Sequence, residues 1–372
     1  MQCSPLSQVQ QRLQVGAPLP FNIRDHDQTL LLARGQRVQS AAQLQALLER
    51  GALVDIDELL SPVDRISRAA AAELPGLWHG CLEQVHQTLR SARDDGFSVA
   101  LESASAPVLA LVARDPDLAI FQVLRQGGNQ HVDYGVNHST HAAITAWLVA
   151  QRLGWSADES QRAFKAALTM NISMLELQGQ LALQPMPPTE EQCAAIHAHP
   201  QFSRLMLEMT GVTDADWLRA VSEHHEAPDG SGYPAGLHGG SDLAALVRRA
   251  DIYTAKISPR ANRDAIAADK AGRMMFMQEP GHPMVAALIK EFGVYPPGCF
   301  VRLASGETGM VVRRGNTVVA PIVAVLGTRL GTALQRPERR DTSQKAFAVQ
   351  GVLGGQNATP LAPAQLLAML AC

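Results

Sequence analysis

The segment His224–Pro234 constrains the fold of this chain more than any other. It reads His-His-Glu-Ala-Pro-Asp-Gly-Ser-Gly-Tyr-Pro and follows a helical pattern over residues 217–225. Pro228, Asp229 and Gly230 end that helix, and glycine permits the tight loop that follows. Two neutral imidazoles near a helix end can converge on one ion, because imidazole is a good ligand for Zn and Fe. A surface histidine pair before an ordinary turn is the alternative, and the length of the string disfavours it.

The composition limits the class of protein. The chain has 372 residues, of which 46% are hydrophobic and 18% charged, so it can form a sizeable core and is long enough for two or three domains. Lys+Arg 32 against Asp+Glu 35 leaves no basic excess, which disfavours nucleic acid as the main partner. The five cysteines lack CxxC spacing, and no apolar run reaches the ~20 residues that a membrane helix needs. We therefore expect a soluble cytoplasmic protein without a membrane segment.

The pattern of hydrophobic residues predicts four parts. Residues 1–62 alternate short strands with one helix and form a small α+β module, and residues 63–130 form a helical linker region. Residues 131–330 are the main region, with several helices followed by short strands at 300–303, 309–312 and 317–319. Residues 331–372 are polar and read as a loose tail with a closing helix near 363–370.

Histidines are concentrated in the main region. Nine of the 12 lie between His131 and His282, and metal or acid–base chemistry is worth seeking in such a cluster. Two capping boxes also start helices there, Ser156 with Glu159 and Thr189 with Gln192.

The His224–Pro234 string resembles the signature of the HD-GYP family, metal-dependent phosphodiesterases of cyclic di-GMP within the HD superfamily. The resemblance spans residues 131–319, about half of the chain. Further matches follow in the family's order: Asn137-His138-Ser139, His199-Pro200, Arg249-Ala250-Asp251, and the arginines Arg260 and Arg263. It implies a mainly α fold, an HD-superfamily helical bundle with a small α+β N-terminal module and a short C-terminal β hairpin.

The resemblance also implies roles for the matching residues. His199, His224 and His225 would bind one metal ion, and His138 with Asp251 would belong to a second metal site. Arg260 and Arg263 would face substrate phosphate. The loop of Gly232, Tyr233 and Pro234 would contact a partner, such as a protein with a diguanylate cyclase domain. His141 and His197 fit helix-face positions better than ligand positions.

The chain departs from the family where the name-giving His-Asp pair is expected. Met170 replaces the His, Asn171 the Asp and Met174 the Lys of that segment. The family Asp bridges two metals, whereas Asn171 is neutral, and two divalent ions without a charged bridge repel each other. A Met thioether is a soft ligand, unsuited to a hard hydrolytic centre, and Met174 cannot pair with phosphate. Catalytic residues are therefore not assigned.

Several alternatives stay open. Either one divalent ion (Zn, Fe or Mn) binds through the three histidines, or the pocket contains no metal. The favoured function is a degenerate phosphodiesterase that binds cyclic di-GMP, a related nucleotide or a partner protein. The alternative is an active phosphodiesterase that forms pGpG or GMP through a residual three-His metal site. The apolar faces of residues 69–124 also permit a homodimer.

Overall fold

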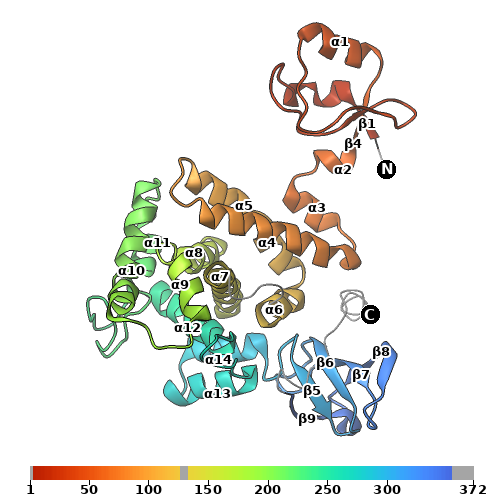
Figure 1. Cartoon of the computed structure of the whole chain (residues 1–372). Coiled ribbons are helices and arrows are strands. Elements are labelled where there is room, and N and C mark those ends of the chain that lie inside the picture. Colours follow the sequence, from red (N-terminus) through yellow and green to blue (C-terminus); the bar gives the residue numbers. More distant parts are fainter. Residues whose placement is uncertain (1–2, 126–132, 354–372) are drawn as a thin grey trace. The chain divides into compact units, whose positions relative to one another are not determined.

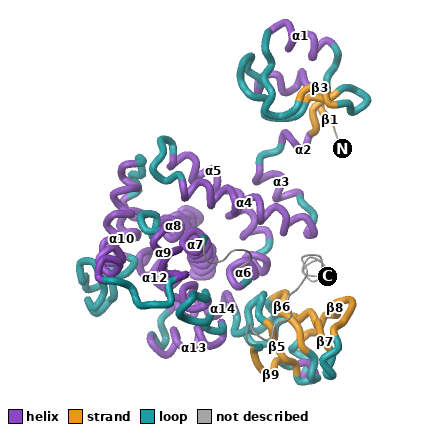
Figure 2. Tube along the Cα trace, viewed as in Figure 1, coloured by secondary structure: helices purple, strands orange, loops and turns teal. Residues whose placement is uncertain are grey.

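The computed structural model describes residues 3–125 and 133–353. The chain divides into two compact units, Met1–Ala69 and Ala70–Cys372. Figure 2 shows the strands in two separate groups, one in each unit, with the helices concentrated in the second. The fold is mainly α, as predicted.

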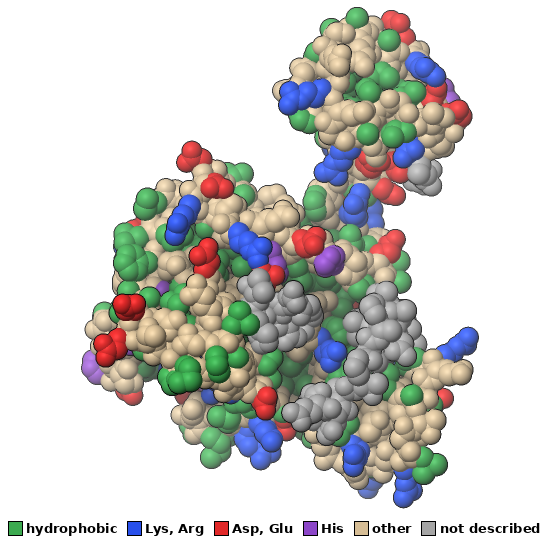
Figure 3. All heavy atoms as spheres, viewed as in Figure 1, with side chains coloured by type: hydrophobic (Ala, Val, Ile, Leu, Met, Phe, Trp, Pro, Cys, Tyr) green, Lys and Arg blue, Asp and Glu red, His purple; other side chains and the backbone are tan. Residues whose placement is uncertain are grey.

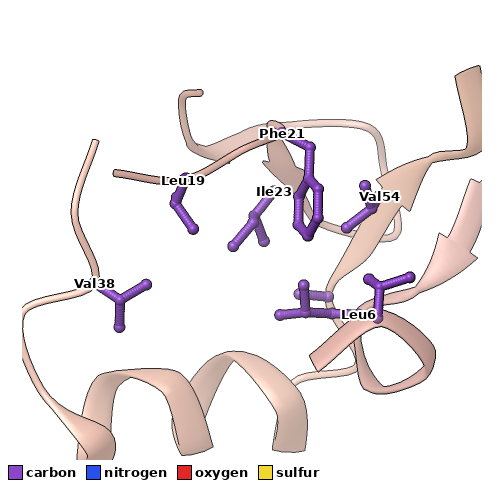
Figure 4. Packing of buried hydrophobic residues seen from close by; sticks show 8 residues of the cluster. Leu6, Leu19, Phe21, Ile23, Val38 and Val54 are labelled. Carbon is purple, nitrogen blue, oxygen red and sulfur yellow. The ribbon is translucent and has the colours of Figure 1, made fainter. Parts of the chain in front are cut away.

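The first unit is the expected α+β module. Its antiparallel sheet has the strand order β1-β4-β2-β3. Its elements are β1 (Cys3–Pro5), η1 (Leu6–Arg12), β2 (Ile23–Arg24), β3 (Leu30–Leu32), α1 (Ala41–Glu49), β4 (Leu53–Asp55), α2 (Ile56–Leu59) and α3 (Pro62–Arg68). Leu6, Phe21, Ile23 and Val54 point toward one another in its core (Figure 4). Burial of these side chains joins the sheet to the helices.

The second unit is built around helix α7. Its helices are η2 (Ala71–Glu73), α4 (Leu74–Arg90), α5 (Phe97–Arg114), α6 (Pro116–Leu124), α7 (Tyr134–Leu153), α8 (Ala157–Thr169), α9 (Leu175–Leu183), α10 (Glu190–Met209), α11 (Ala215–Glu223), α12 (Asp242–Ile257), α13 (Ala268–Gln278) and α14 (Pro283–Phe292). Helix α7 is buried along most of its length and packs against α8, α9, α12 and α14, so it lies in the middle of the bundle (Figure 1).

Side-chain caps define where the helices near the site begin. Both predicted capping boxes are present: Ser156 accepts from the Glu159 N–H at the start of α8, and Thr189 accepts from the Gln192 N–H at the start of α10. Each cap pairs backbone N–H groups that a helix start leaves unsatisfied, which contributes about 1 kcal/mol. The caps therefore fix the register of the helix that carries His199.

The C-terminal part is larger than the predicted hairpin. It is a five-stranded antiparallel sheet of order β8-β7-β6-β5-β9. The strands are β5 (Phe300–Leu303), β6 (Thr308–Arg313), β7 (Ile322–Gly327), β8 (Ala333–Asp341) and β9 (Val349–Val352), with η3 (Lys345–Phe347) before β9. The β5–β6 hairpin is present as expected, whereas residues 317–319 form a turn rather than a strand.

The prediction of a loose tail over residues 331–372 was wrong for β8 and β9. Strand β8 is mostly exposed because it lies at the edge of the sheet, so its sequence lacks the apolar alternation of a half-buried strand. The remainder of the predicted tail, residues 354–372 with its closing helix, lies outside the described residues. The predicted boundary between residues 130 and 131 lies outside them too.

Helix α5 and the distribution of surface charge are relevant to membrane and nucleic-acid binding. Among the described residues, α5 alone is long and apolar enough to span a membrane by length and composition. Its buried face packs against α4, α6 and α7, as in a core helix. On the face drawn in Figure 3, basic and acidic side chains are interspersed, so its drawn residues form no continuous basic surface.

Candidate functional site

Three histidines predicted as ligands come together at one point. His199 lies in the middle of α10, His224 is the C-cap residue of α11, and His225 follows it. Each offers a ring nitrogen, and the three nitrogens lie within 4.8 Å of one another. His199 and His224 are 2% and 0% exposed, so neither imidazole is solvated by bulk water.

The backbone determines which nitrogen of each buried imidazole is free. Nδ1 of His199 lies 2.5 Å from the Ile196 carbonyl oxygen, and Nδ1 of His224 lies 2.7 Å from the Val221 carbonyl oxygen. A carbonyl oxygen only accepts hydrogen bonds, so both Nδ1 atoms carry the proton. In the neutral rings both Nε2 atoms are therefore unprotonated, and these two atoms lie 3.2 Å apart.

Burial keeps these rings neutral. It lowers the pKa of His199 to about 3, with the neighbouring His224 adding to the effect. Burial likewise lowers the pKa of His224 and holds the pKa of His225 well below its usual range. A proton is therefore not available at neutral pH to bridge the two Nε2 lone pairs.

The donor set fits a divalent metal ion. Two lone pairs 3.2 Å apart cannot hydrogen-bond to each other, whereas an ion about 2.1 Å from each would accept both. Three neutral histidines with an open fourth position are a ligand set that Zn²⁺ accepts in proteins. Carbonyl oxygens that hold the other nitrogen are also typical of histidine ligands, because they fix the tautomer and the ring orientation.

His138 and Asp251 form a second pair. His138 lies on α7 and Asp251 on α12, and His138 Nε2 is 2.6 Å from Asp251 Oδ1. Burial alone would raise the pKa of Asp251, but the hydrogen bond from His138 holds it well below its usual range. Asp251 is therefore a carboxylate at neutral pH, and its Oδ1 atom is engaged by His138.

The replaced His-Asp segment forms the turn between α8 and α9. Met170 is the C-cap residue of α8 and is fully buried, and Asn171 is 2% exposed. Asn171 Oδ1 has no hydrogen-bond partner among the described residues. Ser173 ties the turn to α10, because its hydroxyl donates to the His199 carbonyl oxygen at 3.1 Å. The turn thus lies against the helix of the three-histidine set without supplying an imidazole or a carboxylate.

The two predicted phosphate-binding arginines are placed differently. The Arg260 Nε–H donates to the Tyr134 hydroxyl at 2.9 Å, and its guanidinium lies over the Tyr134 ring. Tyr134 also stacks on His138, with ring centroids 5.8 Å apart, so Arg260 is connected to the second pair. Arg263 is exposed and donates to the Ala255 carbonyl oxygen. Of the two, Arg260 is the one joined to the site.

The loop after His225 folds back over the histidines. The Tyr233 ring lies between two imidazoles, with centroids 4.5 Å from His225 and 4.4 Å from His197. Gly232 allows this approach, because a Cβ there would lie 2.3 Å from the Ala227 nitrogen. Pro234, at the tip, is exposed.

Glu226 holds the far side of this loop. Its carboxylate accepts from the Ala235 N–H at 2.8 Å and from the Leu237 N–H at 2.9 Å. Glu226 is buried, so these two bonds are shielded from solvent.

A cavity of about 910 Å³ opens beside the three-histidine set. It lies between the α4–α5 turn, the start of α9 and one face of α10, and His199 and Met174 line it. Much of its wall is apolar, including Leu177, Phe202 and Met206. A volume of this size is in the range of pockets that bury small-molecule ligands.

Several features were not predicted from the sequence. His141, expected on a helix face, is buried, and burial lowers its pKa to about 3. His197 stays outside the three-histidine set, as expected, but its contact with Tyr233 was missed. The part of the α4–α5 turn in the cavity wall was missed too, because no sequence motif there indicates a ligand.

Parts of the chain are similar to known proteins. Residues 124–279 match the HD domain family. A cyclic di-GMP phosphodiesterase of Pseudomonas aeruginosa is 30% identical over 244 residues, 63% of this chain and 58% of that protein. A 3′3′-cGAMP-specific phosphodiesterase of Vibrio cholerae is 29% identical over 170 residues, 44% of this chain and 36% of that protein.

One solved structure supports the fold. An HDG"Y"P protein from Bdellovibrio bacteriovorus superposes with a TM-score of 0.50 and 15% sequence identity, over 77% of this chain and 97% of that one. At this identity the likeness concerns the fold alone. The chain spans about a third to three fifths of the length of the two phosphodiesterases.

Proposed function

Because the chain belongs to the HD-GYP family, we propose that it is a metal-binding receptor for cyclic di-GMP or a related cyclic dinucleotide in bacterial signalling. In this proposal it has lost the two-metal hydrolytic centre and acts by binding the nucleotide. The observation that carries the proposal is the asymmetry of the site. Three neutral histidines converge on one point, while His138 and Asp251 are paired with each other beside the neutral Asn171 turn.

The groups at the site are suited to binding an anion. A divalent ion at His199, His224 and His225 would supply a Lewis acid for a phosphate oxygen. Tyr134 contacts both His138 and Arg260, which connects one cation of this chain to the His138–Asp251 pair. These groups bind and orient an anion without breaking a bond.

Asp251, His199 and His224 are poorly suited to proton transfer. A general base works best with a pKa near the operating pH. Asp251 has a strongly lowered pKa and is a poor base, and the Nε2 atoms of His199 and His224 are directed at the metal point. Without a charged bridge in place of Asn171, a second ion would be repelled by the first.

A second candidate is slow hydrolysis through a single metal. The three-histidine set favours it, because one Zn²⁺ can lower the pKa of a bound water to about 7. The exposed tip of the loop at Pro234 further supports contact with a partner protein, such as one with a diguanylate cyclase domain. We place these events in the cytoplasm, where such nucleotides act.

The test combines binding, turnover and metal content. We expect the purified chain to contain about one Zn, Fe or Mn per chain, to bind cyclic di-GMP, and to release no pGpG or GMP. His224→Ala should lose both metal and nucleotide, whereas His79→Ala, an exposed histidine on α4, should lose neither.

Two outcomes would contradict the proposal. Turnover by the wild type that His224→Ala abolishes would make the chain a single-metal enzyme. A wild type that binds no nucleotide with any of the three metals would exclude the receptor. Met170→His/Asn171→Asp adds a positive control, because restoring the pair should raise the metal content toward two ions per chain.

A further inference from the structure

We propose that the turn between α4 and α5 reads the base of the bound nucleotide and selects guanine over adenine. This inference rests on the proposed function and adds a specificity determinant to it. The turn covers residues 91–96, which lie outside residues 124–279, the part that matches the HD domain family. The turn belongs to the helical region that precedes that part.

The first observation is the shape of the cavity. One face of α10 forms a long wall, and the residues on it follow the spacing of four and three that places side chains on one helix face. These residues are Ala195, His199, Phe202, Met206 and Met209. The α4–α5 turn, with Ala92 to Gly96, forms another wall of the same cavity, and α9 contributes Glu176 and Leu177.

The second observation ties the cavity to the metal point. His199 lines the cavity, is 2% exposed, and has an Nε2 lone pair without a donor. Of the three histidines, His199 lines this cavity. If an ion at the three-histidine set held a phosphate, the attached nucleoside would be within reach of the cavity. Its apolar wall suits a base, because the thioethers of Met174 and Met206 and the ring of Phe202 pack against flat aromatic systems.

The third observation is the charge at the rim. Arg93 on the α4–α5 turn lines the cavity, and so do three exposed acidic residues, Asp94, Asp95 and Glu176. Within residues 3–125 and 133–353, none of their carboxylates has a hydrogen-bond or ion-pair partner, so their acceptor atoms are free to bind a ligand. Three carboxylates against one arginine leave this rim net acidic, which is unexpected beside a site for an anion because negative charge repels phosphate. Such a rim favours a ligand that also presents hydrogen-bond donors.

Guanine presents such donors. Its Watson–Crick edge carries two adjacent donors, N1–H and N2–H₂, which match the two oxygens of one carboxylate. Adenine presents one amino group beside the N1 lone pair, and that lone pair faces a carboxylate unfavourably. A free carboxylate therefore favours guanine over adenine, and a site built on such donors discriminates strongly against a ligand that lacks them.

The test measures the dissociation constants of cyclic di-GMP and cyclic di-AMP for the full chain loaded with Zn. We expect the wild type to bind cyclic di-GMP at least about 10-fold more tightly, which corresponds to about 1.4 kcal/mol. In Asp94→Asn/Asp95→Asn/Glu176→Gln this ratio should fall to about one. The ratio is the readout because the loss of three negative charges raises the affinity for both anions alike.

The matched control is Glu190→Gln/Glu191→Gln. These exposed carboxylates lie on the first turn of α10 and do not line the cavity, so the ratio should stay at its wild-type value. A second arm uses Phe202→Ala, which should weaken both nucleotides by the same factor because stacking does not distinguish the bases. An unchanged melting temperature and an unchanged metal content show that each variant is folded. If the triple variant does not fold, the single variant Glu176→Gln is used in its place.

The outcomes separate this inference from the proposed function. If the wild type binds both nucleotides equally, or if the rim variant keeps the wild-type ratio, the α4–α5 turn does not select guanine and the receptor function stands. If the control variant changes the ratio as much as the rim variant does, general electrostatics explains the effect and the inference is overturned. If the wild type binds neither nucleotide, the receptor function itself has failed.

Discussion

The burial of His141 predicts a specific loss of stability in acid. His141 lies on α7 and is buried, and its Nδ1 has no partner among the described residues. Burial lowers its pKa to about 3, with His138 and then His86 adding to the effect. In the unfolded chain the same imidazole has a pKa of about 6.5. Below that pH the unfolded state binds a proton at His141, whereas the folded state does not.

The sign and the size follow from this difference. The folded-state pKa is depressed, so the stability due to neutral His141 is complete above about pH 6.5 and is lost as the pH falls toward about 3. Each pH unit in this window removes about 1.4 kcal/mol. Lowering the pH from about 7.5 to about 5 therefore removes about 2 kcal/mol through His141 alone, a large share of the usual stability of a domain.

The assay is urea unfolding of the metal-free chain at the two pH values, followed by the helical circular dichroism signal. His141→Gln, which is neutral throughout, should lose about 2 kcal/mol less than the wild type over this range. His199, His224 and His225 shift in the same direction but contribute equally to both proteins, so the difference isolates His141. The exposed His79→Gln should behave as the wild type. An equal loss in His141→Gln and wild type would refute the argument.

Three further results are expected. Gly232→Ala should destabilise the second unit by about 1–3 kcal/mol, because the added Cβ would lie 2.3 Å from a backbone nitrogen, and a lower urea midpoint would show this. The control is Gly80→Ala in the middle of α4, where an added Cβ meets nothing within 4 Å. That substitution should instead stabilise the unit. Glu291→Gln should lower the stability by about 1–2 kcal/mol and should do so less at high salt, because this buried carboxylate pairs with both Arg152 and Arg314. Removing the metal with a chelator should lower the melting temperature, and Zn at 100 times its dissociation constant should restore about 2.7 kcal/mol; an unchanged melting temperature would contradict a metal bound to the folded state.

Local signals explain why much of the helical part could be predicted. The capping boxes at Ser156 and Thr189 and the loop after His225 are set by neighbours within a few residues, and the structure contains them. The exposed edge strand β8 carries no apolar alternation, so its pattern resembled a loose tail. Pairing with β7 decides the conformation of β8. A loop separates the two strands, and the hydrophobic periodicity of the sequence does not reveal which strands pair.

The same contrast between local and long-range information applies to the site. The resemblance of the His224–Pro234 string to the HD-GYP signature made His199, His224 and His225 candidate ligands, and it showed Met170 and Asn171 where the family has its His-Asp pair. The free nitrogens also follow from local structure, because His199 and His224 each donate from Nδ1 to a carbonyl oxygen three residues earlier in the chain. Tertiary structure decided that the two Nε2 atoms meet 3.2 Å apart, because α10 and α11 must pack together for that.

The pairing of His138 with Asp251 and the closure of a cavity by the α4–α5 turn likewise depend on contacts between distant segments. Sequence by itself determines which chemical groups are present and which face of a helix they occupy. Packing decides which of them meet, how far they are desolvated and therefore what charge they carry.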